Sequence, residues 1–144
     1  GRKYRFQITD QQLHPTDGLM YFLLEDENRR KHLLKKKYYV HYGFRIGMEI
    51  CCVVDSLASD GHYLLEPEHP CYTIGEVYDF PITRLEKLEY SDGFVQQQAI
   101  LSDCHYEEVK VLVDDETLPL YQGKETVSCR VIRIRKSRLE VEPA

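Results

Sequence analysis

No apolar run in this chain approaches the ~20 residues that a membrane-spanning helix needs, and no signal peptide is visible. The phosphate-binding glycine loop, the nucleophile elbow, the H-E-x-x-H helix and the kinase signatures are all missing. The six histidines are scattered, and none has an acidic partner at a telling spacing. We therefore expect no membrane contact, no cofactor and no catalytic residue, and we do not expect an enzyme.

The chain has five cysteines, and no two of them form a C-x-x-C pair. Cys51 and Cys52 are adjacent on a predicted strand, so their side chains should point to opposite faces. We interpret the cysteines as free buried thiols of a reducing compartment, which predicts a cytoplasmic protein. A zinc site assembled from His69, Cys71 and distant partners is the alternative, but the spacing is not typical of structural zinc, and no metal site is expected.

The sequence repeats itself. The segment 4–9, which begins Tyr-Arg-Phe, reads almost the same as 78–83, which begins Tyr-Asp-Phe, and later landmarks recur in the same order at similar spacings. Asp17-Gly18 matches Asp92-Gly93, for example. We infer two copies of a unit of roughly 75 residues, 1–70 and 71–144. Each lies near the lower limit for a self-sufficient core, so we expect the two units to pack on each other.

The first residue is Gly1 rather than Met, which is typical of a chain cut from a longer protein. Other domains of that protein are therefore among the expected partners.

Each unit shows short apolar segments separated by turn residues, with almost no helical periodicity. The strands expected in the first unit are 3–9, 19–25, 38–44, 48–54 and 62–66, with a hairpin turn at 58–61. The apolar run 19–25 is typical of a strand covered on both faces.

In the second unit the expected strands are 77–90, 94–102, 109–113, 126–135 and 138–142. Pro81 lies within the first of them and indicates an edge strand or a bulge. The stretch 29–37 would also fit a short helix, but its repeat partner, 107–113, reads as a strand. The fold class predicted is all-β: two tandem five-stranded barrels or sandwiches.

The end of each unit resembles the last two strands of S1-like OB-fold domains. The residues concerned run from Gly47 through Glu49, Cys52 and Val54 to the segment 63–67, and from Gly123 to Val141 in the second unit. In that family a glycine begins the fourth strand and a short turn leads to the fifth. The resemblance implies two five-stranded OB-like barrels, and binding of single-stranded nucleic acid, RNA more than DNA.

The strongest functional candidate is the segment 29–44, where basic residues run directly into tyrosines. Aromatic rings can stack on bases while lysines and arginines follow the phosphates, and in OB-folds the central strands carry the ligand. The predicted nucleic-acid-binding residues are Arg29, Arg30, Lys35, Lys36, Lys37, Tyr38, Tyr42 and Phe44.

Two observations oppose this hypothesis. A strand with aromatic residues on one face is often simply packed against a core, with the adjoining lysines solvated. Moreover, residues 1–70 are neutral and 71–144 carry a net charge of −5, which is not the footprint of a strong nucleic-acid binder. Binding should therefore be confined to the first unit and depend steeply on salt.

The second unit has Asp114, Asp115 and Glu116 where the first has lysines and tyrosines. Its basic run between Arg130 and Arg138 spans a predicted turn and is interpreted as solvated. A protein-interaction or regulatory module that uses exposed strand edges is the alternative function.

Overall fold

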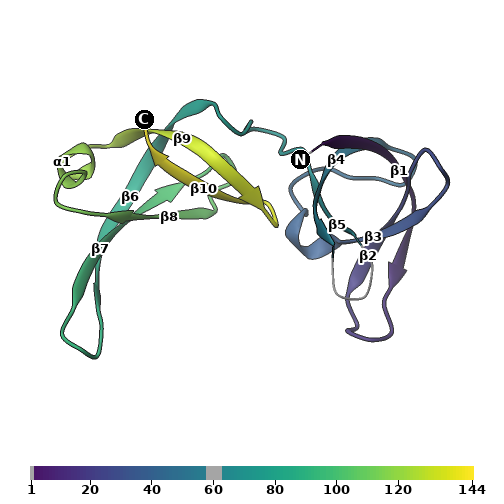
Figure 1. The fold of residues 1–144 in the computed structure, drawn as a ribbon, viewed down its shortest axis with the longest axis horizontal. Helices are drawn as coiled ribbons and strands as arrows, with labels where there is room; N and C mark the ends of the chain where they lie inside the picture. The colour runs from purple at the N-terminus through teal and green to yellow at the C-terminus, as the bar shows by residue number, and fades with distance from the viewer. Residues whose placement is uncertain (1, 58–62) are drawn as a thin grey trace. The chain divides into compact units, whose positions relative to one another are not determined.

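The computed structural model describes residues 2–57 and 63–144 (Figure 1). By its internal contacts the chain divides into two compact units, Gly1–Pro70 and Cys71–Ala144. Each is a five-stranded antiparallel sheet with one short helical turn. The predicted fold class, all-β with two tandem five-stranded barrel-like units, is confirmed.

The first unit has the sheet order β3-β2-β1-β4-β5. A 3-10 turn, η1, follows β3 directly. The element bounds are β1 (Lys3–Leu13), β2 (Met20–Glu25), β3 (Lys31–Lys35), η1 (Lys36–Tyr38), β4 (Glu49–Leu57) and β5 (Tyr63–Pro67). The hairpin turn expected at 58–61 lies outside the described residues, as does residue 62 of the last expected strand.

The second unit repeats this topology with the order β10-β9-β6-β7-β8. Its two end strands, β8 and β10, also contact each other. The element bounds are β6 (Val77–Glu89), β7 (Val95–Ser102), β8 (Glu108–Val113), α1 (Leu118–Tyr121), β9 (Thr126–Arg135) and β10 (Arg138–Pro143).

The central strand of each unit changes partners along its length. β6 pairs with β9 from Val77 to Pro81 and with β7 from Ile82 onward, with an irregularity at Thr83. Pro81 therefore lies on a central strand and not on an edge. Its missing N–H falls where one ladder ends and the other begins, which is why proline is tolerated there. β1 has the same irregularity at Thr9.

A glycine with positive φ precedes the fourth strand of each unit, Gly47 at 97° and Gly123 at 73°. The Gly47 N–H donates to the Ile8 carbonyl of β1 at 2.7 Å. A side chain would strain this turn, because L-residues rarely adopt that backbone conformation.

Each unit has its own core. In the first, Phe6 and Ile8 of β1 face Phe22 and Leu24 of β2, and all four are almost fully buried. In the second, Phe80 takes the place of Phe6 and packs with the inward residues of β7, β8 and β9. Alternation along the strands produces these cores, since every second side chain points inward. On β2 only this alternate set is buried, so the expectation that 19–25 is covered on both faces was wrong.

The third strand of the first unit lies earlier than predicted. β3 occupies Lys31–Lys35, where β8 of the second unit would place it, and the predicted strand 38–44 was wrong. Residues 36–44 form η1 and successive turns instead. Their aromatic side chains had suggested a strand, but they pack over the core: Tyr39 is 4% exposed and donates its hydroxyl to Glu66 Oε1 at 3.1 Å.

The prediction that all five cysteines are free thiols was wrong for two of them. Cys71 and Cys104 form a disulfide within the second unit. Cys51, Cys52 and Cys129 are free, and Cys52 is buried while Cys51 is half-buried, as their opposite directions on β4 require. Among the described residues, no helix has the length and apolar character to cross a membrane.

Candidate functional site

The outward side of β2 and β3 brings tyrosine and lysine together. Tyr21 of β2 pairs with Lys35 of β3, and Leu23 pairs with Leu33. These side chains point away from the core, since Phe22 and Leu34, the pair between them, point inward and are buried.

The turn η1 extends this surface. Lys37 is exposed, and its Nζ lies 5.0 Å from the ring centroid of Tyr38 in a cation–π contact. Tyr38 is also near enough to Tyr21 to contribute to the raised pKa of that phenol. We call the surface formed by Tyr21, Lys35, Lys37 and Tyr38 the aromatic-basic face.

Tyr21 is held in place from the β1–β2 loop. Its hydroxyl donates to Asp17 Oδ2 at 2.5 Å, and its ring lies 5.2 Å from the ring of His14. Burial, followed by the bond to Asp17, raises the pKa of Tyr21 to about 12. The phenol is neutral over the physiological range. The negative charge beside the face is that of Asp17, because the bond from Tyr21 lowers the pKa of its carboxyl.

The other predicted binding residues lie apart from this face. Lys36 is turned over the barrel end, where its Nζ donates to Gln11 Oε1 at 3.1 Å and lies 5.8 Å from the centroid of Phe22. Arg29 and Arg30 lie in the β2–β3 turn, at the far end of β3, about 17 Å from Lys35 for a strand of five residues. Of the predicted set, Lys35, Lys37 and Tyr38 lie at the aromatic-basic face.

Tyr42 and Phe44 are half-buried in an aromatic cluster over the core. The Tyr42 ring lies 5.1 Å from Tyr39, 5.3 Å from Phe44 and 5.4 Å from His69. Phe44 also lies 5.8 Å from Phe22, edge-on. Because other rings surround them, this packing disfavours the predicted stacking role of Tyr42 and Phe44 and indicates a structural one.

Tyr21 is the residue that the sequence analysis missed. Its alternation with Phe22 and Leu24 was visible in the run 19–25, but a strand covered on both faces leaves no outward tyrosine to consider. His14 and Asp17, which orient Tyr21, come from a loop whose approach to β2 cannot be inferred from sequence spacing.

The second unit has no counterpart of the aromatic-basic face. Gln98 of β7 pairs with Leu112 of β8 as Tyr21 pairs with Lys35. Exposed Asp114 and Asp115 follow β8, where Lys37 and Tyr38 follow β3. The chemistry that suits an anionic, ring-bearing ligand is thus confined to the first unit.

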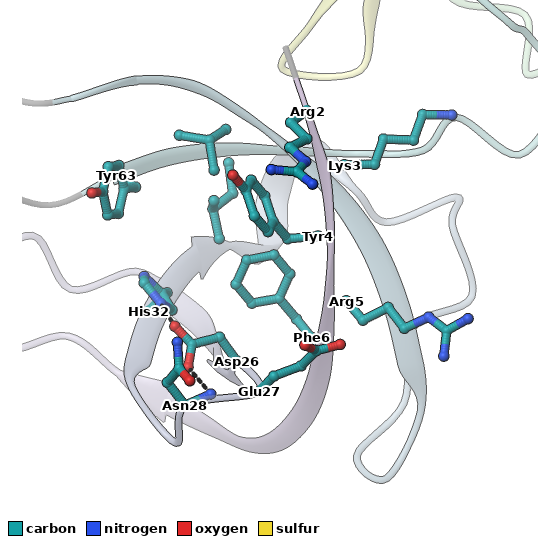
Figure 2. Close-up of a pocket in the computed structure, with 12 residues that line it drawn as sticks. Arg2, Lys3, Tyr4, Arg5, Phe6, Asp26, Glu27, Asn28, His32 and Tyr63 are labelled. Carbon is teal, nitrogen blue, oxygen red and sulfur yellow. Dashed lines mark hydrogen bonds and ion pairs between the residues drawn. The ribbon is translucent and has the colours of Figure 1, made fainter.

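The first unit also has a hollow of about 610 Å³ (Figure 2). It lies beside β1, the β2–β3 turn and the start of β5. Arg2, Tyr4 and Phe6 alternate toward it, while Lys3 and Arg5 point to the other side of the strand. The rim carries Asp26, Glu27, Asn28, His32 and Tyr63. The lining is completed by Lys3, Arg5, Val54 and Leu65.

Asp26 fixes the turn at this rim. Its Oδ1 accepts hydrogen bonds from the backbone N–H groups of Asn28 and Arg30, at 2.8 and 2.9 Å, and its Oδ2 lies 3.0 Å from His32 Nε2. The bond to His32, followed by the two backbone bonds, holds the pKa of the Asp26 carboxyl below its usual range.

Asp26→Asn is expected to remove a pH-dependent part of the stability. A lowered folded pKa contributes stability above the unfolded pKa of about 3.9, and this stability is lost as the pH falls through the folded value. Urea unfolding should therefore show the variant less stable than the parent at about pH 6, with the difference shrinking toward about pH 3. Exposed Asp55→Asn is the control, and a difference independent of pH would contradict the assignment.

No family model matches the chain, and no curated protein matches it in sequence.

Proposed function

We propose that the first unit is a non-catalytic module that binds single-stranded nucleic acid through the aromatic-basic face. The observation that supports this is the gathering of Tyr21, Lys35 and Lys37 on the outward side of β2, β3 and η1. Tyr38, whose half-buried ring packs against the core, lies beside Lys37. Stacking on aromatic rings with lysines along the phosphates is how sequence-tolerant binders hold single strands. The ligand-bearing face of an OB-type barrel is also formed by its second and third strands.

The finer parts of the proposal depend on the family resemblance. The S1-like pattern around Gly47 and Gly123 favours RNA over DNA. A cytoplasmic location is proposed from the three free cysteines, and the Cys71–Cys104 disulfide counts against it, since disulfides persist mainly in oxidising compartments.

The test is the binding of fluorescent oligomers of about ten nucleotides, oligo(U) and oligo(dT), followed by anisotropy. With two phosphate contacts, one for each lysine of the face, the salt slope for a single strand is about −1.4, so affinity should fall about sevenfold between about 50 and about 200 mM salt. Lys35→Glu/Lys37→Glu should weaken binding at least tenfold at the lower salt and flatten the slope. Lys87→Glu/Lys110→Glu, two exposed lysines of the second unit, is the matched control.

The stacking part is tested separately. Tyr21→Ala and Tyr38→Ala should each weaken binding about tenfold, the effect expected when one base loses its platform. Tyr21→Phe keeps the ring and should bind nearly as the parent does. Equal binding by the parent and by both alanine variants would eliminate the face as the site.

A protein partner is the second candidate, and one observation favours it. β6 and β7 extend as a hairpin beyond the rest of their sheet (Figure 1). The hairpin tip carries Tyr90, Phe94 and Val95, which are 47%, 57% and 51% exposed. Exposed apolar side chains that cluster in this way are typical of protein contacts.

A further inference from the structure

The two units differ at an equivalent position of their fold, beside β1 in the first unit and beside β6 in the second. In the first unit Tyr4, which is 46% exposed, forms a wall of the hollow beside β1. Phe6 at its base is 3% exposed, and the His32 ring meets it edge-on at 5.4 Å. In the second unit the matching residues are Tyr78 and Phe80, which pair with Cys129 and Val127 as Tyr4 and Phe6 pair with Cys52 and Ile50.

A tyrosine ring fills that place in the second unit. The Tyr72 ring is stacked on Phe80 at 5.5 Å with an interplanar angle of 25°, and it meets Tyr78 edge-on at 4.9 Å. Its neighbour Cys71 is joined by the disulfide to Cys104 in the β7–β8 turn. The second unit thus shows that this part of the barrel accepts a planar ring over the phenylalanine of its central strand.

The turns at the two places are the same as well. Asp103 Oδ1 accepts from the N–H groups of His105 and Glu107, as Asp26 Oδ1 accepts from those of Asn28 and Arg30. The turn is thus shared by the two units, and the ring against the phenylalanine differs. Tyr72 stacks on Phe80 in the second unit, whereas His32 meets Phe6 edge-on at 5.4 Å in the first.

The open hollow of the first unit has polar groups suited to an anionic, ring-bearing ligand. The Arg2 guanidinium lies beside the Tyr4 ring, and Asn28 lies at the opposite rim (Figure 2). Arg29 and Arg30 follow Asn28 in the turn, and none of the three arginines forms an ion pair with a described residue. Two acids, Asp26 and Glu27, lie at the rim. The oxygens of Asp26 already accept from the turn amides and lie against His32, so a ligand would meet Glu27 as the more available carboxylate.

We infer that this hollow binds one nucleotide. Its base packs against the exposed ring of Tyr4, on the side of the hollow that Tyr63 also lines, Asn28 hydrogen-bonds to the base edge, and Arg2 pairs with the phosphate. A fully cationic ligand is disfavoured, because Arg2 would repel it. The inference rests on the proposed function, because it takes the class of ligand from it. It adds a second site, separate from the aromatic-basic face. The same chemistry would come from a free mononucleotide or from one nucleotide of a strand.

The experiment is two-dimensional ¹H–¹⁵N NMR of the whole chain, titrated in separate arms with adenosine monophosphate, uridine monophosphate, inorganic phosphate and N-acetyltyrosinamide. Either nucleotide should shift the resonances of Tyr4, Asn28 and Tyr63, and phosphate alone should shift them far less. Tyr4→Leu and Arg2→Ala should each weaken nucleotide binding about tenfold. Tyr106→Ala, which removes a 91% exposed ring from the matching turn of the second unit, should change nothing.

Arg2 and Asn28 are exposed, so Arg2→Ala and Asn28→Ala keep the test valid even if Tyr4→Leu unfolds the chain. Absence of nucleotide shifts at these residues, or tighter binding of N-acetyltyrosinamide than of either nucleotide, would overturn the inference.

An oligo(U) arm separates the hollow from the face and identifies the source of the nucleotide. One outcome is oligomer binding that depends on Lys35 and Lys37 but not on Tyr4 or Arg2, with no mononucleotide binding. This outcome would overturn the nucleotide site in the hollow and leave the proposal for the aromatic-basic face intact. Mononucleotide binding that survives Lys35→Glu/Lys37→Glu supports the hollow even if oligomers do not bind. If oligo(U) shifts Tyr4 and displaces the mononucleotide, the source is a nucleotide of a strand; if it does not, the source is the free nucleotide.

Discussion

Removing the Cys71–Cys104 disulfide should lower the free energy of unfolding of the second unit by about 3–4 kcal/mol. The bond closes a loop with a sequence separation of 33 residues, and the chain-entropy estimate for such a loop has this size. The double variant Cys71→Ser/Cys104→Ser, compared with the parent in urea without reductant, measures it. For a unit near the lower size limit this is a large part of the total stability.

Its control is Cys51→Ser, a half-buried free cysteine of the first unit. This variant should leave the second unit unchanged. Reductant should destabilise the parent by a similar amount and leave the double variant unaffected. A loss below about 1 kcal/mol in the double variant would mean that the bond contributes little to this fold.

Phe22→Ala should destabilise the first unit by about 3–5 kcal/mol, the usual cost of removing a large buried ring. Phe22 is 1% exposed at the centre of its core. It also supports two of the residues singled out by the sequence, since Phe44 meets its ring edge-on at 5.8 Å and the Lys36 ammonium lies 5.8 Å from its centroid. Urea unfolding, followed by NMR signals of the first unit, measures the loss.

Leu13→Ala is the comparison, because Leu13 lies on β1 of the same unit and is 63% exposed. It should change stability by no more than about 0.5 kcal/mol. Equal losses of stability in the two variants would mean that Phe22 does not belong to the core of the first unit.

The fold could be predicted from the sequence because the same order of strands and turns occurs twice in it. The strand at 126–135 was predicted with its observed bounds, and 138–142 came within one residue. Turn residues and alternation carry this information locally, so a second copy of the pattern is enough to choose among folds.

The third strand of the first unit shows where local patterns fail. The aromatic residues Tyr38, Tyr42 and Phe44 lie at the even spacing that a strand would give, but they pack against the core. Tyr39 between them is buried and hydrogen-bonds to Glu66. The packing of Tyr39 depends on a partner 27 residues away, and the periodicity of a short segment contains no information about such a contact. The repeat had pointed to the correct place, since β8 aligns with Lys31–Lys35.

The candidate site was found only in part for the same reason. Lys35, Lys37 and Tyr38, which composition singled out, lie at the proposed face, whereas Tyr21 required the β2–β3 register. The packing of Tyr42 and Phe44 against the core is a tertiary contact that composition does not show. The disulfide was missed because its cysteines lie far apart in sequence and outside any C-x-x-C spacing.

The most direct measurement is a ¹H–¹⁵N NMR titration of the whole chain with oligo(U) of about ten nucleotides at about 50 mM salt. The account predicts that the largest shifts fall on Tyr21, Lys35, Lys37 and Tyr38, that they fade at about 200 mM salt, and that β7 and β8 of the second unit do not respond. No shifts at the lower salt, or shifts concentrated in the second unit, would contradict it.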